Sequence, residues 1–187
     1  MHSDLIGKIE KARQYAYEPE RIVIEELRAR FHGSNNDHII TLAEGHWTCD
    51  CRTFDTWGTC AHIMALQKIL YPMLPVALRE GNNGSSPDNH PVYSSLIGKI
   101  EKARQYAYEP ERIVIEELHA RFRGSNNDHI ITLADGNWTC DCEFFRMWQT
   151  CAHVMALQKL LDPMLSTEAL QSGTPVAVQE EMASVLS

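Results

Sequence analysis

Long apolar runs and a surplus of basic residues are both missing from this sequence. The chain has 187 residues and a formal net charge of −8, and none of its apolar runs approaches the roughly 20 residues of a membrane-spanning helix. The N-terminus, Met1-His2-Ser3-Asp4, lacks the basic start and apolar core of a signal peptide. We therefore expect a soluble, cytoplasmic protein. Its acidic balance disfavours non-specific binding to nucleic acid, although a local basic face remains compatible with it.

Recognisable catalytic motifs are also missing. The sequence contains no His-Glu-x-x-His, no His-x-Glu followed by Pro-Cys-x-x-Cys, no nucleotide-binding loop and no pattern typical of a catalytic triad. We therefore predict that the protein is not an enzyme and has no small-molecule substrate.

An internal repeat organises the chain. Residues 5–74 and 96–165 align without a gap, and 58 of the 70 aligned positions are identical. Residues 81–93, rich in Gly, Asn, Ser and Pro, are typical of a flexible linker. We predict a first unit at residues 1–80, a linker at 81–93, a second unit at 94–165 and a polar tail at 166–187, with a short helix starting near Thr174.

Six cysteines are the chemically informative residues, three in each copy. An odd number per copy excludes complete disulfide pairing within a copy, and Cys-x-Cys, eight residues, Cys-x-His is typical of a tetrahedral zinc site. Disulfides, incidental thiols and iron are the weaker alternatives. Four protein ligands fill a tetrahedral shell, so we predict two structural zinc ions per chain. The predicted ligands are Cys49, Cys51, Cys60 and His62, and Cys140, Cys142, Cys151 and His153.

Hydrophobic periodicity predicts an α+β fold. In the first copy, residues 3–17 predict an amphipathic helix, and residues 21–32 predict a strand with a bulge near Glu25. Residues 38–43 and 46–50 predict two further strands joined by a Glu44-Gly45 turn, and residues 60–70 predict a helix. Each unit is thus expected to be a helix, a three-stranded antiparallel sheet, a zinc loop and a helix.

The cysteine pattern, directly after a Trp-containing strand and at the start of an apolar helix, resembles the SWIM zinc-finger family. The tight match covers residues 47–66 and 138–157. The resemblance implies a β-β-α arrangement around one zinc ion, and DNA-binding or protein-interaction roles. Many members carry a proline after the second cysteine and a lysine before the histidine. Here those positions hold Arg52 or Glu143, and Ala61 or Ala152, so direct phosphate contact beside the metal is not expected.

Two groups of residues are candidates for an interaction surface. Aromatic side chains in the zinc loops can either shield the metal from water or contact a partner. Basic residues on one strand face can either be solvated or contact phosphates. The candidates are Phe54, Trp57, Phe145 and Trp148, together with Arg28, Arg30, Arg121 and Arg123. We regard His38 and His129 as structural or solvated, and we reject His46 as a ligand because the second copy has Asn137.

A non-enzymatic interaction module is the function that these patterns favour. The first hypothesis is an adaptor that binds a protein partner in a DNA-transaction complex, which the acidic balance supports. The second hypothesis is a direct DNA- or RNA-binding protein, in which tandem units gain avidity.

Overall fold

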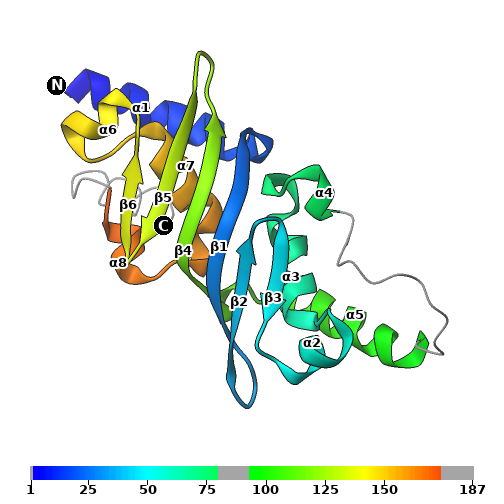
Figure 1. Cartoon of the computed structure of the whole chain (residues 1–187). Helices are drawn as coiled ribbons and strands as arrows, with labels where there is room; N and C mark the ends of the chain where they lie inside the picture. The colour runs from blue at the N-terminus through cyan, green and yellow to red at the C-terminus, as the bar shows by residue number, and fades with distance from the viewer. Residues whose placement is uncertain (1, 80–92, 174–187) are drawn as a thin grey trace.

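The computed structural model describes residues 2–79 and 93–173. The first copy contains a long helix, three strands, a short helix inside the zinc loop and a second long helix (Figure 1). Its elements are α1 (His2–Ala16), η1 (Pro19–Arg21), β1 (Ile22–His32), β2 (Asp37–Ala43), β3 (His46–Cys49), α2 (Arg52–Trp57), α3 (Ala61–Leu70), η2 (Tyr71–Met73) and α4 (Val76–Arg79).

The second copy repeats this order. Its elements are α5 (Tyr93–Ala107), η3 (Pro110–Arg112), β4 (Ile113–Arg123), β5 (Asp128–Ala134), β6 (Asn137–Cys140), α6 (Glu143–Trp148), α7 (Ala152–Leu161), η4 (Asp162–Met164) and α8 (Thr167–Gln171). The predicted helix near Thr174 lies outside the described residues. Among the described helices, none combines the length and apolarity required to cross a membrane.

The predicted α+β class is confirmed, with one difference in the sheet. Each copy contributes three antiparallel strands, but the six strands form one continuous sheet in the order β3-β2-β1-β4-β5-β6. The two long strands β1 and β4 pair antiparallel at its centre, where Leu27 faces Leu118. These two leucines are equivalent in the two copies, so the copies are related by an approximate two-fold axis. The pairing removes the two longest edges that separate three-stranded sheets would expose.

The bulge predicted near Glu25 is present. The β1–β4 register shifts between Ile24 and Glu26. One extra residue in β1 moves the alternation of side chains along by one position. Ile22 and Ile24 before the shift and Leu27 after it are therefore all buried on the same face. The bulge thus keeps the whole apolar side of β1 turned toward the helices.

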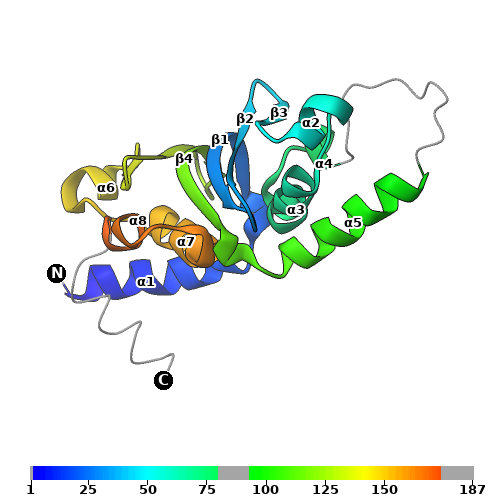
Figure 2. The ribbon, with the colours of Figure 1, turned by 90° about the horizontal axis from the view of Figure 1, so that it is seen from below.

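The first long helix of each copy lies on the other copy. Helix α1 packs against α7, and α5 packs against α3. All four lie on one face of the sheet (Figure 2). Their buried contact residues include Ala12 and Tyr15 on α1, with the equivalent Ala103 and Tyr106 on α5. Each copy therefore completes its hydrophobic core with a helix from the other copy.

Candidate metal centre

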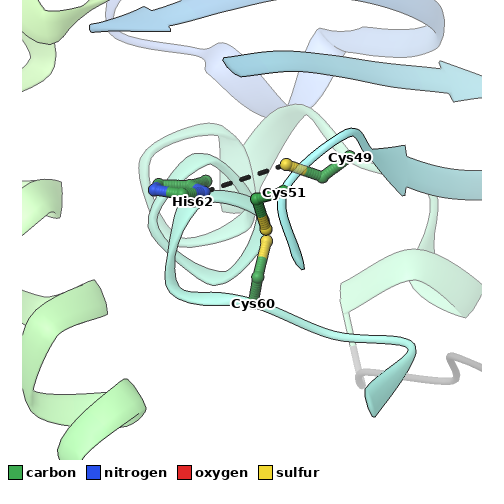
Figure 3. Close-up of side chains that lie close together, drawn as sticks. All are labelled: Cys49, Cys51, Cys60 and His62. Atoms are coloured by element: carbon green, nitrogen blue, oxygen red, sulfur yellow. Dashed lines mark hydrogen bonds between the residues drawn. The ribbon is translucent and has the colours of Figure 1, made fainter. Parts of the chain in front are cut away.

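The first cluster consists of Cys49, Cys51, Cys60 and His62. The side chains of these residues converge from the end of β3, the start of α2 and the start of α3 (Figure 3). All three cysteines are buried. The four ligand atoms lie within 4.8 Å of one another, and Cys49 Sγ lies 3.8 Å from His62 Nδ1.

The second cluster consists of Cys140, Cys142, Cys151 and His153, and it has the same geometry. Its ligand atoms also lie within 4.8 Å of one another, with 3.8 Å between Cys140 Sγ and His153 Nδ1. In a tetrahedral site with Zn–S near 2.3 Å and Zn–N near 2.0 Å, neighbouring ligand atoms are separated by roughly 3.5–3.8 Å. Both clusters therefore fit one zinc ion each, bound by four protein ligands.

Local backbone structure places the sulfur atoms. Cys51 is the N-cap residue of α2, and its Sγ accepts a hydrogen bond from the backbone N–H of Phe54 at 3.4 Å. Cys151 is the N-cap residue of α7, and its Sγ accepts one from the N–H of Val154 at 3.5 Å. Backbone N–H groups at a helix N-terminus favour a thiolate over a thiol. The helices therefore support the charge that zinc ligation requires.

The helices α2 and α6 lie within the zinc loops, where we predicted no helix. Besides its cysteine N-cap, α2 ends at Gly58, which has a left-handed conformation with φ of 64°. The equivalent residue at the end of α6, Gln149, adopts φ of 53°. Eight residues between ligands are thus enough for a short capped helix, whose outer face points away from the metal cluster.

Mutual contacts shift the pKa values of the thiols. The hydrogen bond with Cys60, followed by burial, raises the pKa of Cys49 far above its ordinary value. Hydrogen bonding with Cys142 raises the pKa of Cys140 to about 12. The pKa of Cys142 is lowered by its hydrogen bonds with Cys140 and Cys151. Because three adjacent thiolates repel one another, a divalent cation is what allows all of them to ionise, and its binding releases protons.

Two further histidines support the ligand histidines. His38 stacks on His62 with ring centroids 4.6 Å apart, and its Nδ1 lies 3.0 Å from Asp50 Oδ1. His129 occupies the same position beside His153, with 4.5 Å between ring centroids. The contact with Asp50 holds the His38 ring against the ring of the ligand His62. We expected His38 and His129 to be structural or solvated, and both lie half-buried beside the ligand histidines.

A tyrosine from the other copy also contacts each cluster. The ring of Tyr15 on α1 stacks on His153 at 5.8 Å and packs against Phe122 at 4.7 Å. Tyr106 makes the equivalent contacts with His62 and Phe31. The helical periodicity of residues 3–17 cannot reveal that the neighbour of Tyr15 is a metal ligand of the other copy.

The predicted aromatic candidates divide into two groups. Phe145 is buried and Phe54 is half-buried, whereas Trp57 and Trp148 are 45% and 50% exposed. A lysine from the other copy lies over one of them: Lys99 Nζ is 4.9 Å from the Trp57 ring centroid. The phenylalanines are thus placed to shield the clusters, while the tryptophans face solvent.

The predicted basic candidates lie near the centre of the sheet. Arg28 and Arg30 donate hydrogen bonds to Glu116 of the other copy. Arg121 donates one to Glu25 at 2.5 Å. Arg123 is exposed at the end of β4. Three of these four guanidinium groups therefore join the two copies, which reduces the positive charge available to a phosphate.

Comparison with known protein families gave one result. A family model described as the SWIM zinc finger matches residues 35–66 and residues 129–157. Neither the curated proteins nor the solved structures gave a match. The two matched regions contain both complete Cys3His clusters. Two regions of the chain are therefore similar to the SWIM zinc finger, and each contains four residues that fit one structural zinc ion.

Proposed function

We propose that the protein is a non-catalytic adaptor that binds a protein partner in a DNA-transaction complex. The observation that carries the proposal is the exposed apolar surface on the zinc-loop helices. Met147 is 63% exposed, next to Trp148 at 50% in α6, and Trp57 occupies the same position as Trp148 in α2. Exposed tryptophans on a rigid scaffold are typical of the anchoring residues of protein interfaces.

The zinc sites support a binding role rather than catalysis. Each cluster offers four protein ligands, which leaves a tetrahedral ion no position for a substrate or an activated water. Zinc instead fixes the short helices that present Trp57 and Trp148. The chemistry of the donor set thus favours a structural ion beneath an interaction surface.

Direct nucleic-acid binding is the second candidate, supported by one cavity. A cavity of about 530 Å³ beside the second cluster is lined by Lys8, Lys11 and Phe144, which suit a phosphate and a base. Asp141 and Glu143 line the same cavity, and their charges oppose a phosphate. This mixed charge makes the protein partner the better-supported occupant.

Two experiments test the proposal. In the first, the intact chain and the double variant W57A/W148A are used as baits, with Y17A as a control for loss of an exposed aromatic residue elsewhere. The double variant is expected to lose the partner and Y17A to retain it. Equal capture by all three baits would contradict the proposed surface.

The second experiment is a salt titration with DNA and RNA oligonucleotides. We expect no binding at low salt that is strong enough to define a slope. A steep decrease in affinity with salt, reflecting several released counterions, would favour the nucleic-acid candidate instead.

A further inference from the structure

The two copies meet through the same surface on each side. In the pairing of β1 with β4, Ile22 faces Phe122, and the equivalent residues face each other in reverse, Phe31 opposite Ile113. An interface in which residue i contacts j and j contacts i is isologous, the type that joins the subunits of two-fold symmetric dimers. The two copies of this chain are therefore joined in the same way as the subunits of a homodimer.

Side-chain contacts across the interface are also duplicated. Arg21 donates to the backbone carbonyl oxygen of Arg123 at 3.2 Å, and the equivalent Arg112 donates to that of His32 at 3.3 Å. Because the acceptors are backbone carbonyls, the different side chains at these two positions leave the hydrogen bond unchanged. The tyrosine that stacks on each ligand histidine lies at the same centroid distance, 5.8 Å, in both copies.

The sequences of the interacting elements are almost the same in the two copies. The pairing surface runs along α1 and β1, and residues 5–31 are identical to residues 96–122 at 26 of 27 positions. The exception is Arg28, which is His119 in the second copy. The receiving helices α3 and α7 differ at two positions, and both remain apolar. These pairs are Ile63 and Val154, and Ile69 and Leu160.

The one difference in the pairing surface does not select a partner. Arg28 lies 3.1 Å from Glu116, and His119 lies 3.2 Å from Glu25, the equivalent glutamate. A pair of two first copies would contain the arginine contact twice, and a pair of two second copies would contain the histidine contact twice. Together they hold the same contacts as two mixed pairs, so the charges favour neither arrangement.

The covalent connection distinguishes the two possible partners. Residues 80–92 connect α4 to α5. A short linker between two binding modules gives an effective concentration on the order of millimolar. The other copy of the same chain therefore competes successfully with copies in other chains at lower protein concentrations.

We propose that a second molecule of this chain is a partner for the pairing surface, and that either copy pairs with either copy of that molecule. The covalent connection, rather than side-chain chemistry, makes each chain pair with itself. In a dimer of two chains, each zinc cluster would receive its tyrosine from the other chain, and the zinc-loop helices of both chains would belong to one assembly. This partner is distinct from the protein partner proposed above.

The experiment cuts the connection and lets the copies choose. A protease site is inserted between Asn82 and Asn83 of the full chain. The cut protein is unfolded with denaturant and chelator, and refolded with zinc at about 10 μM, well below the effective concentration of the linker. Native mass spectrometry distinguishes the three possible pairs by mass. We expect all three, with mixed pairs forming about half of the total, as random pairing through one isologous surface gives.

A charge exchange in one copy should change this ratio. In the variant E116R/R121E, Arg28 and Arg30 of the first copy would face an arginine in a mixed pair, whereas each copy would still complement itself. Mixed pairs should decrease about threefold, because exposed ion pairs are replaced by contacts between like charges. Adding the equivalent exchange in the first copy, E25R/R30E, should restore the original ratio.

The uncut chain gives an independent measurement. After refolding at about 1 mM it should contain dimers of two chains, and after refolding at about 10 μM it should be monomeric. Zinc content of one ion per copy identifies the pairs as folded.

Three results would overturn the proposal. The first is mixed pairs alone after cutting, because the side chains would then select the partner. The second is cut copies that do not associate. The third is an uncut chain that stays monomeric at both concentrations. None of these measurements includes another protein, so their outcome is independent of the bait experiment.

Discussion

Replacing Tyr15 by alanine is expected to loosen the second zinc cluster, not the cluster of its own copy. Tyr15 is 2% exposed, and its ring packs against Phe122 and His153 of the other copy. Truncation of a buried aromatic residue to alanine costs about 3–5 kcal/mol. Docking of α1 is expected to protect the second cluster. A loss of this size would then make the opening of that cluster more frequent by two orders of magnitude or more, and its cysteines would react correspondingly faster.

Cysteine alkylation followed by mass spectrometry measures this effect at each cluster. The zinc-loaded protein is treated with an alkylating reagent and a weak chelator, and the rates at Cys140, Cys142 and Cys151 are compared with those of the first cluster. Y15A should accelerate alkylation of the second cluster. Y106A should accelerate alkylation of the first.

The variant Y15F is the matched control. The Tyr15 hydroxyl is buried and has no hydrogen-bond partner among the described residues. Removing it should therefore change the stability by less than about 1 kcal/mol, or increase it. If Y15A instead exposes the cysteines of the first cluster first, the exchange of helices between the copies is wrong.

Three further predictions concern the sheet, the zinc-loop helices and the metal. E116Q removes the charge that joins Arg28 and Arg30 to β4. Because these ion pairs are partly exposed, the free energy of unfolding, measured with denaturant, should decrease by less than about 1 kcal/mol. Gly58 and Gln149 both have left-handed backbone conformations, which favour glycine. G58A should therefore lower the free energy of unfolding by about 1 kcal/mol in the same assay, and Q149G should raise it. Zinc content after dialysis should decrease as the pH is lowered, because protons compete for thiols such as Cys49, whose pKa is raised by Cys60 and by burial. Unchanged zinc content at acidic pH would contradict the thiolate ligand set.

The zinc ligands and the main elements follow from short-range sequence patterns. The spacing of Cys49, Cys51, Cys60 and His62 predicts a cluster because alternation along a strand and the first turn of a helix are local geometry. The alternation of apolar and polar residues within 21–32 likewise predicts β1, and the expected bulge near Glu25 is present. Local rules are sufficient wherever the relevant partners lie within a few residues.

The zinc-loop helices were missed although their signals are local. Cys51 serves both as a metal ligand and as a helix N-cap, and Gly58 occupies the left-handed position that ends α2. The spacing of the cysteines predicts only a metal-binding role for Cys51. A cysteine in place of the usual Ser, Thr, Asp or Asn is a weak capping signal, so the helix was not predicted.

The sequence by itself determined that the chain is a duplication, that each copy forms a helix, three strands and a helix, and that each copy carries a Cys3His site. Only the tertiary structure decided that the six strands form one sheet and that α1 and α5 exchange partners. Near-identical copies offer near-identical apolar faces, so the pattern of one helix fits either α3 or α7 equally well. The choice depends on the antiparallel pairing of β1 with β4, which lies between residues about 90 positions apart and has no local signature.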